Sequence, residues 1–578
     1  MIIYSCKNCN DLECETSICP VCNNRTQIVK SEIYWCKNCN IPLYNKICSC
    51  CNGKAEYIGT DIRPVFPEER LLLECLRGKP FEFAGHSIWN ISGNKYIVDG
   101  KKIKFSVKDS IKNDYKIIKQ RIKSNKSKNF AYENTFFEQE YIKKFINANT
   151  IRLNYITTEA INYIKEQAKD FKEDSMFVSF SGGKDSTVTS DIVMRALGKE
   201  NIIHVYGDTT LEYPTTATYI KRFKDKHKKT PMLVAKNKEQ DFNELCKVIG
   251  PPSRLMRWCC TIFKTGAITR KIDSTFKDKR NILTFQGIRR AESTARSKYE
   301  RESDSSKISK QHTVAPLIDW QEFDIWLYII SNRVDFNDAY RQGFARVGCW
   351  CCPNNSIWSE YLSSIYMTEK YIDFHKILID FAKNVGKPDP EDYISSGGWK
   401  ARQGGNGLLY SKNAIVEFKP CVLLENTLNF ELTKNINNNL YELFKPFGNL
   451  NFTIGNKRLN EVYILQRKTN EPLVKLTGKV GQNKLKVSIL KFVPPFNDMK
   501  ISEILVKNQI TKFQTCIGCL ACESNCKYNS IKITNIGDSE NICYRIDENK
   551  CVGCLECVKH FSGGCFMKKV LRTKLNNE

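Results

Sequence analysis

Cysteine spacing constrains this chain more than any other feature of its sequence. Of the 27 cysteines among 578 residues, most fall into Cys-x-x-Cys groups. This spacing lets two neighbouring thiolates reach one metal, whereas disulfide-stapled chains are usually short, secreted and without such repeated pairs. We therefore expect metal sites in a reducing compartment rather than a disulfide framework.

Residues 1–57 contain two similar four-cysteine units. The segments YSCKNCN and YWCKNCN are near copies, so the region is an internal repeat. Four thiolates close a tetrahedral zinc site and leave no open position, which is typical of tandem zinc ribbons. Such ribbons either contact nucleic acid or protein, or only stabilise a segment too short to fold alone. The expected zinc ligands are Cys6, Cys9, Cys19 and Cys22 in the first unit, and Cys36, Cys39, Cys48 and Cys51 in the second.

Changes in composition along the chain set the remaining predicted domain boundaries. Residues 58–128 predict a small β-rich module, loosely similar to PUA-like RNA-binding modules, followed by a basic stretch that reads as helix and then linker. Residues 396–510 alternate apolar runs with turns and predict a β-containing domain of unknown role. Residues 511–578 form a second cysteine-rich domain.

Residues 129–395 are expected to form a central α/β domain. The apolar segments MFVSF, IIHVYGD and ILTFQ alternate with helical sequence, which predicts a doubly wound parallel sheet. The loop SGGKDS stands between the first strand and its helix. Its glycines let the backbone approach phosphate, the helix amino terminus supplies positive potential, and Lys184 adds a charge. A Walker A loop would need the different spacing GxxxxGK followed by Ser or Thr.

SGGKDS resembles the PP-loop of enzymes that cleave ATP between its α and β phosphates. The segments GDTTLEYPTT, GIRRAESTARS, PLIDWQEFDIWLYI and YRQGFARVGCWCCP follow in order, and together they resemble the PAPS-reductase-like branch of the PP-loop (adenine nucleotide alpha hydrolase-like) family. Arginines suit phosphate or sulfate through paired hydrogen bonds, although an ordinary surface role for Arg289 and Arg290 is the alternative. The resemblance implies nucleotide binding by Ser181, Gly182, Gly183, Lys184, Asp185, Ser186, Asp208, Thr209, Glu292 and Arg296, and catalytic roles for Lys184, Asp185, Arg289 and Arg290, with Mg²⁺ bridging phosphates. Glu212, Thr215 and Ser293 belong to the same motifs.

A further cysteine set lies inside the central domain. Trp258-Cys259-Cys260 and Cys349-x-x-Cys352 resemble the cluster ligands of adenosine phosphosulfate (APS) reductases and DNA phosphorothioation proteins. The resemblance implies a 4Fe-4S cluster held by Cys259, Cys260, Cys349 and Cys352. Cys351 could replace one of these ligands, and a zinc site is the alternative.

The carboxyl-terminal cysteines resemble those of a two-cluster bacterial ferredoxin, in which the fourth cysteine of each run serves the other cluster. Lys527 replaces the usual proline, and the spacing to Cys565 is longer than usual. Electron transfer is the expected role, with a purely structural cluster pair as the alternative. The implied sets are Cys516, Cys519, Cys522 and Cys565 for one 4Fe-4S cluster, and Cys526, Cys551, Cys554 and Cys557 for the other.

Two enzymatic functions fit this combination, and a nucleotide-sensing, nucleic-acid-binding protein is a third. The first is an ATP-dependent sulfurtransferase that adenylates tRNA or DNA and replaces oxygen with sulfur. The second is a ferredoxin-coupled APS or PAPS reductase that produces sulfite. The chain lacks the ECG-type nucleophile motif of sulfonucleotide reductases, and Cys421 stands in a different context, which favours the sulfurtransferase. The unassigned Cys75, Cys246, Cys351, Cys421 and Cys543 decide between them if one lies near the loop.

The formal charge of +26 predicts a polyanionic partner. Five metal sites of roughly −2 each would leave roughly +16, and a Lys-rich proteome would also produce a basic chain. We expect ATP (or APS or PAPS), two zinc ions and three 4Fe-4S clusters as cofactors, and nucleic acid, tRNA before DNA, and an electron donor as partners. A homodimer is an option. No apolar run approaches the roughly 20 residues of a membrane span, and the start MIIYSCKNCN lacks a signal-peptide pattern. We therefore expect a cytoplasmic protein without a membrane partner.

Overall fold

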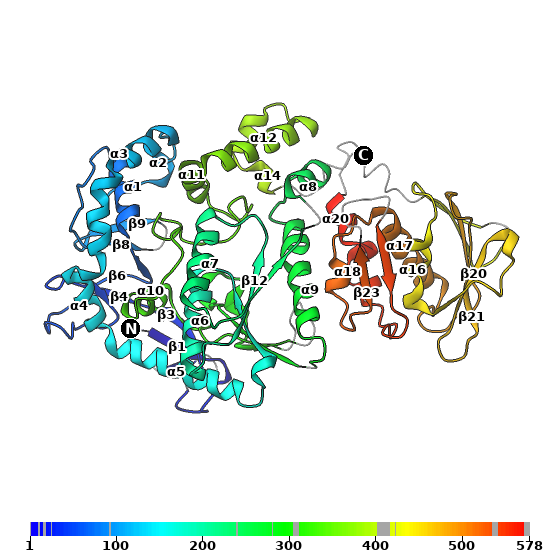
Figure 1. Ribbon diagram of the computed structural model, residues 1–578, viewed down its shortest axis with the longest axis horizontal. Coiled ribbons are helices and arrows are strands. Elements are labelled where there is room, and N and C mark those ends of the chain that lie inside the picture. Colours follow the sequence, from blue (N-terminus) through cyan, green and yellow to red (C-terminus); the bar gives the residue numbers. More distant parts are fainter. Residues whose placement is uncertain are drawn as a thin grey trace.

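The structure is a computed structural model that describes most of the chain. The described residues are 2–9, 12–14, 19–24, 26–91, 94–238, 241–279, 281–303, 311–401, 417–421, 424–534 and 542–571. They form a row of bodies: the ribbons with a small amino-terminal module, the central α/β domain, the cysteine-rich tail, and a β-sheet domain (Figure 1). The tail lies between the central domain and the sheet domain, although it follows both in sequence.

Two small antiparallel sheets hold the paired cysteines of the amino-terminal repeat. In each four-cysteine group the Sγ atoms all lie within 4.8 Å of one another. A zinc ion with Zn–S bonds of about 2.3 Å would space its sulfurs by about 3.8 Å, so both groups fit a tetrahedral metal. The first ribbon contains β1 (Ile2–Cys6), β2 (Leu12–Cys14) and β3 (Gln27–Ser31), and the second contains β4 (Ile33–Cys36), β5 (Ile41–Leu43) and β6 (Glu56–Gly59).

The two ribbons differ in how they contact the rest of the chain. Trp35 and Tyr44 of the second ribbon share the main hydrophobic core with Phe145 and Phe323. The Tyr44 and Phe323 rings lie 4.6 Å apart, edge to face. Among the described residues, the buried cluster of the first ribbon consists of its own cysteines. The second ribbon is therefore a structural part of the central unit.

The basic stretch 108–128, expected to be a helix followed by a linker, is mostly helical in the structure, and its helix continues past residue 128. Helix α3 (Tyr115–Thr135) begins with Asp114, whose side chain accepts a hydrogen bond from the Lys116 amide, and it buries Ile118. It packs against α1 (Pro67–Arg77) and α11 (Ile357–Tyr366). The boundary at residue 128 therefore falls inside a helix. The β-rich part is a four-stranded sheet of β7 (Ile62–Pro64), β8 (Ile88–Ile91), β9 (Lys95–Val98) and β10 (Lys101–Lys102), followed by α2 (Val107–Ser110).

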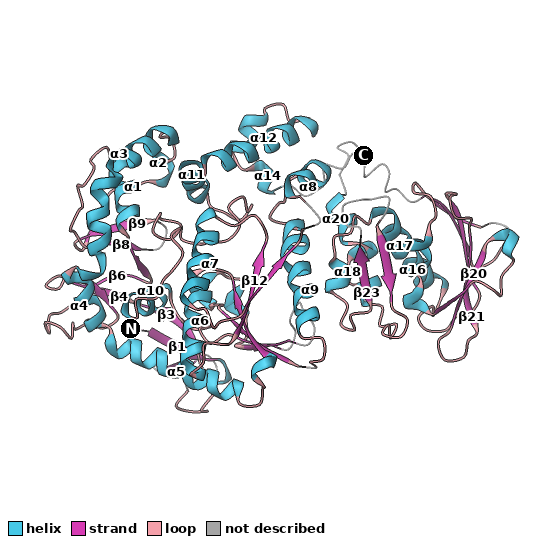
Figure 2. Cartoon of the chain, in the orientation of Figure 1, coloured by secondary structure: helices cyan, strands magenta, loops and turns pink. Residues whose placement is uncertain are grey.

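The central domain is built on a six-stranded sheet whose order is β13-β12-β11-β14-β16-β15. The first five strands are parallel, and β15 pairs antiparallel at the edge. Met176 and Val178 of β11 pack with α6, whereas Phe177 packs with α9 on the other face. Helices therefore cover both faces (Figure 2), which confirms the predicted α/β class with a parallel sheet. The strands are β11 (Met176–Phe180), β12 (Ile203–Asp208), β13 (Met232–Lys236), β14 (Ile282–Gln286), β15 (Glu302–Ser303) and β16 (Gln311–Val314).

Helices complete the central domain and join it to its neighbours. They are α4 (Glu140–Ala148), α5 (Thr150–Ala168), α6 (Lys184–Leu197), α7 (Pro214–Lys226), α8 (Phe242–Ile249), α9 (Gly266–Thr275), α10 (Glu322–Ser331), α12 (Thr368–Asn384), α13 (Pro390–Ser395) and α14 (Gly398–Ala401). A π-helical turn, Cys260–Thr265, leads directly into α9. This turn matters below because it carries one of the predicted cluster ligands.

The sheet domain and the tail share one hydrophobic core. Phe430 and Val487 of the sheet lie in the same cluster as Ile531 and Val558 of the tail. Helix α17 (Met499–Thr515) passes through this core, so the predicted boundary at residue 510 falls inside a helix. The six sheet strands are β17 (Glu417–Pro420), β18 (Thr427–Glu431), β19 (Asn449–Asn451), β20 (Glu461–Leu465), β21 (Pro472–Thr477) and β22 (Lys484–Ile489), with helix α16 (Asn438–Glu442) beside them. The tail contains α18 (Ala521–Ser524), β23 (Ile531–Thr534), β24 (Cys543–Ile546), α19 (Glu556–Lys559) and α20 (Phe566–Leu571).

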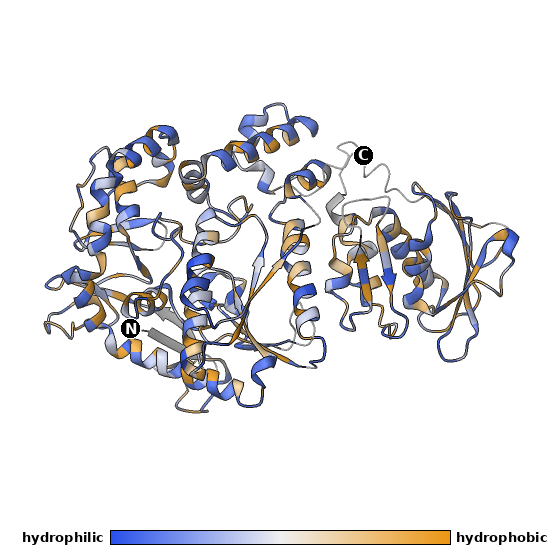
Figure 3. Ribbon diagram, viewed as in Figure 1, coloured by the Kyte–Doolittle hydropathy of each residue, from blue (hydrophilic) through white to orange (hydrophobic). Residues whose placement is uncertain are grey.

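Hydropathy follows this layering, with apolar residues along the strands of the central sheet and hydrophilic stretches on the outer helices (Figure 3). None of the helices in the described part of the chain combines the length and apolarity that crossing a membrane demands.

Candidate nucleotide site and cysteine clusters

The loop 181–183 joins β11 to the amino terminus of α6 at the carboxyl edge of the parallel sheet. Gly182 has φ +71°, and a Cβ there would lie 3.0 Å from Thr216. Glycine is therefore needed both for the backbone conformation and for the close approach. The Ser186 hydroxyl accepts from the Ser181 amide at 3.2 Å and donates to the Gly183 carbonyl at 2.9 Å, which holds the loop closed on the first turn of α6.

The side chains of Lys184, Asp185 and Arg289 form a buried ionic network rather than an open site. Lys184 Nζ lies 3.5 Å from Asp185 and 3.4 Å from Glu322, and Arg289 pairs with the same two carboxylates. Lys184 is 4% exposed and Arg289 is 2% exposed. Burial would raise the pKa of Asp185, but the neighbouring Arg289 and Lys184 charges outweigh it and hold that pKa below its usual value. Asp185 is therefore a carboxylate.

The floor of this network comes from segments far from the loop in sequence: Glu322 and Tyr340 lie inside two of the quoted motif segments, whereas Asp61 lies in none of them. Glu322 begins α10, and its backbone amide donates to Asp61 at 3.0 Å. Burial and the Glu322 charge raise the pKa of Asp61 to about 7. The Tyr340 hydroxyl accepts from the Lys184 amide at 3.0 Å. The amino-terminal module therefore supports the loop from behind through Asp61.

The remaining arginines of the predicted motif lie at two places. Arg290 pairs with Asp319 and donates to the Tyr299 carbonyl, so it stabilises its own loop. Arg296 pairs with Glu292 four residues earlier. Burial lowers the pKa of Arg296, and the nearby Arg346 charge lowers it further. Repulsion between two guanidinium groups would be relieved by a bound anion. Sequence reasoning missed Arg346, although it lies inside the quoted segment YRQGFARVGCWCCP.

The second nucleotide motif contacts the central cysteines directly. Thr209 Oγ1 lies 3.5 Å from Cys349 Sγ and donates to Glu212 at 2.6 Å. The Trp350 amide donates to the Leu211 carbonyl at 2.9 Å, which ties the Cys-x-x-Cys segment to the end of β12. Asp208 accepts from the Thr210 amide at 2.9 Å and pairs with Lys236. Among the described residues, the buried Thr215 hydroxyl has no hydrogen-bond partner.

The structure brings the four predicted central ligands into one neighbourhood. A hydrogen bond with Cys260, burial, and the charges of Cys260, Cys349 and Cys351 raise the pKa of Cys259. Burial raises the pKa of Cys352, and the charge of Cys260 raises it further. Unlike the ribbon thiols, no three of these described thiols lie within 4.8 Å of one another. The set is therefore more open than the two ribbon sites.

The tail places its cysteines in two groups. Cys516, Cys519 and Cys522 lie in the field of Cys565, and we call these four the inner set. Cys557 lies in the field of Cys522 of the inner set and of Cys551 and Cys526; following the sequence prediction, we call Cys526, Cys551, Cys557 and the exposed Cys554 the outer set. Lys512 of α17 lies between the sets. It is 1% exposed, and its ammonium donates to the Cys557 carbonyl. Burial would lower the pKa of Lys512, but the surrounding thiolates outweigh it and raise that pKa.

The inner set docks against the central cysteines. Cys519, Cys565 and Met567 share a buried cluster with Trp258 and Cys351. A Cβ on Gly266, directly after the π-helical turn, would lie 3.0 Å from the Leu520 side chain. Arg270 of α9 pairs with Glu523 at 3.0 Å, and Asn529 donates to Asp273 at 3.0 Å. The two domains are therefore held together at the cysteines themselves.

The unassigned cysteines lie in several parts of the fold. Cys75 ends α1 in the field of Glu74 and Arg121. Cys246 lies on α8 and faces Cys351, which is itself buried beside the central set. The Cys421 amide donates to the Thr427 carbonyl in the sheet domain, and Cys543 pairs with Thr534 in the tail.

Comparison with known proteins identifies the central domain. The family model described as "Phosphoadenosine phosphosulfate reductase domain" matches residues 175–355. An uncharacterized protein from Methanocaldococcus jannaschii is 25% identical over 65% of this chain and 97% of its own length. The adenosine 5'-phosphosulfate reductase of Neisseria meningitidis serogroup B is 38% identical over 17% of this chain, and the match spans 36% of that enzyme.

A crystal structure of the PAPS reductase from Candida auris, in a phosphate complex, aligns with 34% of this chain and 94% of its own, at 15% identity and a TM-score of 0.27. Residues 175–355 match the phosphoadenosine phosphosulfate reductase domain model, and part of the central domain is similar to adenosine 5'-phosphosulfate reductases.

Proposed function

We propose that this chain is an ATP-dependent sulfurtransferase that adenylates a nucleic acid and replaces one of its oxygens with sulfur. The observation that carries the proposal is the contact between Thr209 of the nucleotide motif and Cys349 of the central set, at 3.5 Å. This contact would bring sulfur or electrons to the edge of the sheet where the nucleotide is expected. The docked inner set extends the same line of cysteines into the tail.

The reaction balances as follows. An oxygen of the acceptor attacks the α-phosphorus of ATP, the bond to the β-phosphate oxygen breaks, and pyrophosphate leaves. Hydrosulfide then attacks the adenylated carbon and loses its proton, the carbon–oxygen bond breaks, and AMP leaves. With a persulfide as the sulfur source, cleavage of the sulfur–sulfur bond takes two further electrons from a low-potential donor. The amides at the start of α6 and the Arg296–Arg346 pair would hold the phosphates.

The cysteine sets fit the implied metal groups. The compact ribbon sites fit one zinc ion each. The central set is wider, which suits a cluster that places several iron atoms between its thiolates better than it suits a single zinc. Between the tail sets, Lys512 is a buried cation, and its printed hydrogen-bond acceptor is a carbonyl rather than a carboxylate. Two anionic clusters would supply the missing negative charge. When bound, such clusters carry electrons one at a time.

Reduction of APS or PAPS to sulfite is the second candidate. The curated relatives named adenosine 5'-phosphosulfate reductase favour it, and the Arg296–Arg346 pair suits a sulfate group equally well. Cys75, Cys421 and Cys543 lie in other parts of the fold, whereas Cys246 and Cys351 lie beside the central set and are the candidates for the nucleophile that such a reductase needs.

Nucleotide product analysis separates the two candidates. Anaerobically purified protein is given ATP, APS and PAPS separately, each with and without bulk tRNA. We expect AMP and pyrophosphate from ATP, increased by RNA, and sulfur in the recovered RNA. Sulfite from APS or PAPS, with ATP untouched, would replace the sulfurtransferase proposal with the reductase.

A further inference from the structure

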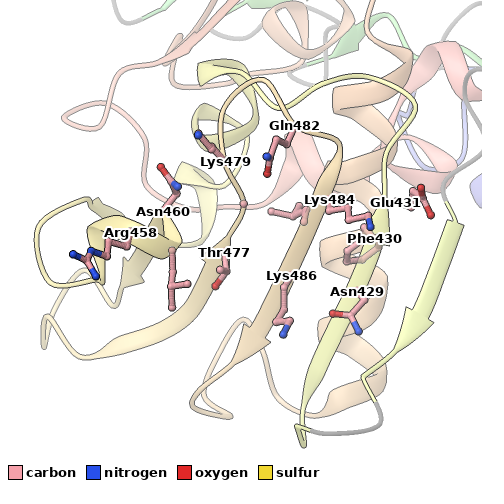
Figure 4. A pocket seen from close by; sticks show the side chains of 13 residues that line it. Asn429, Phe430, Glu431, Arg458, Asn460, Thr477, Lys479, Gln482, Lys484 and Lys486 are labelled. Atoms are coloured by element: carbon pink, nitrogen blue, oxygen red, sulfur yellow. The ribbon is translucent and has the colours of Figure 1, made fainter.

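The sheet domain carries a groove on the face that its own core does not use. Side chains alternate along the strands, so Leu428 and Phe430 of β18 and Val487 of β22 point toward the core around α17. Their neighbours Asn429 and Lys486 point to the opposite face, where they stand directly opposite each other across the two strands. A cavity of about 620 Å³ lies on this face, and its lining side chains gather above the sheet in Figure 4.

The groove is basic and its charges are uncompensated. Arg458, Lys479, Lys484 and Lys486 line it, against a single lining carboxylate, Glu431. Arg458 comes from the β19–β20 loop and Lys479 from the β21–β22 turn, whereas the two other lysines stand on the sheet. None of these four cations forms an ion pair with any residue that the structure describes. Like charges held together without partners favour an anionic ligand that brings several negative charges.

The uncharged lining favours a nucleic acid among such ligands. Beside its four cations, the groove offers amides from Asn429, Asn460 and Gln482. Amide groups can both donate to and accept from base edges. Leu459 lies in the groove and is 55% exposed, and Phe452 in the same loop is 53% exposed. Proteins commonly bind single-stranded nucleic acids on an open sheet face, where cations contact the backbone and flat or apolar side chains contact the bases.

We propose that this groove binds single-stranded nucleic acid, with Lys484 and Lys486 contacting phosphates and Asn429, Asn460 and Gln482 contacting bases. The site lies at the far end of the molecule from the PP-loop domain, beyond the tail. A ligand that occupied both places would have to be a polymer. The groove would give the proposed sulfurtransferase a surface for its acceptor, but binding there does not depend on turnover at the loop.

Binding of a fluorescein-labelled 20-nucleotide oligouridine to the full chain, followed by fluorescence anisotropy, tests the proposal. The test variant is the double charge reversal Lys484→Glu, Lys486→Glu on the exposed sheet face. We expect Kd to rise at least tenfold and the slope of log K against log salt to become shallower by about 1.4, because each lost phosphate contact removes about 0.7. The matched control reverses two exposed lysines of the same domain outside the groove, Lys468→Glu and Lys500→Glu, and should change Kd less than threefold.

Three outcomes would overturn the proposal: no binding by the unaltered chain, equal loss in both double variants, or crosslinks from a 4-thiouridine oligonucleotide that map only outside residues 429–486. If the groove variant binds RNA normally but accepts electrons more slowly from an acidic donor protein, the groove belongs to a protein partner instead.

The neutral variant Asn429→Ala, Asn460→Ala should weaken binding without changing the salt slope, which separates base contacts from a general charge effect. The melting temperature of each variant checks that it is folded. Failure of RNA thiolation with binding intact would count against the proposed function alone.

Discussion

The inner and outer cysteine sets of the tail share one small fold but face different surroundings. In the inner set, Cys519 is 8% exposed and Cys565 is 4% exposed, and both pack against the central domain. In the outer set Cys554 is exposed, and Val552 beside it is 57% exposed. One set is therefore enclosed between domains and the other is open to solvent. If both hold clusters, electrons would enter at the outer set and leave through the inner one.

Among the variants that test this contrast, Cys519→Ser should lower the melting temperature most. It removes a buried ligand from a site that joins two domains, and metal sites contribute several kcal/mol to folding. We expect the melting temperature of the anaerobic protein to fall by about 10 °C or more, with loss of close to one cluster's iron. Cys554→Ser removes an exposed ligand of the other set and should lower the melting temperature much less. If calorimetry gave equal shifts in melting temperature for Cys519→Ser and Cys554→Ser, the distinction between the two sets would be wrong.

Lys512→Met should come next, because it removes the buried charge that both sets share. A buried charge that loses its partner costs about 3–5 kcal/mol, and here the anionic sets on both sides would lose theirs. Chemical denaturation under anaerobic conditions measures the change. Lys507→Met on the same helix is the matched control. It pairs with Glu503 near the surface and should cost less than about 0.5 kcal/mol. If Lys512→Met left the free energy of unfolding unchanged, the two sets would carry less negative charge than we propose.

Arg270→Gln should loosen the inner set from the central domain. Arg270 donates to Glu523 at 3.0 Å and to the Ile533 carbonyl, and hydrogen bonds to charged groups contribute about 1.5–3 kcal/mol. We expect about 2 kcal/mol of lost stability and slower reduction of the central set by prereduced tail, measured by stopped-flow absorbance. The outer set should take up electrons from an external donor at its original rate. Slower uptake there would show that the two sets are not separable.

Arg467→Gln should have the smallest effect on stability and a specific effect on the outer set. Arg467 Nη2 lies 3.3 Å from Cys551 Sγ and 2.7 Å from the Lys445 carbonyl. Removing a cation and hydrogen bond from a cluster sulfur disfavours the reduced form, so the outer midpoint potential should become more negative. Potentiometric titration monitored by electron paramagnetic resonance can follow both tail signals. A shift in the inner signal as well would contradict a contact limited to Cys551.

The sequence was most informative where chemistry depends on local spacing. The Cys-x-x-Cys pairs predicted the two ribbon sites, SGGKDS between a strand and a helix predicted the loop, and the alternation of strands with helices predicted the parallel sheet. Partners contributed from far along the chain could not be predicted in this way. Glu322 lies 138 positions after Lys184, and Asp61 precedes it by 123. Nothing near the loop signals that Lys184 and Arg289 are neutralised by these distant carboxylates.

Helices run across two of the predicted domain boundaries for a related physical reason. Composition changes near residues 128 and 510. Helix α3 nevertheless continues past the first point and α17 past the second, because one face of each helix is buried against other segments. The polar sequence of α3 hides that face, since Ile118 and Asn129 are the residues it buries. The shared core of sheet and tail likewise depends on which surfaces meet, which no local pattern encodes.

The embedded second ribbon has a practical consequence for anyone who shortens this chain. A truncation that begins at residue 58 would remove Trp35 and Tyr44, which pack with Phe145 and with Phe323 of α10. Glu322, at the start of that helix, neutralises Lys184 and Arg289. If the second ribbon holds zinc, zinc starvation of a growing culture would act on the same packing, so scarcity of that metal would disorder the loop 181–183, which contains none of its ligands.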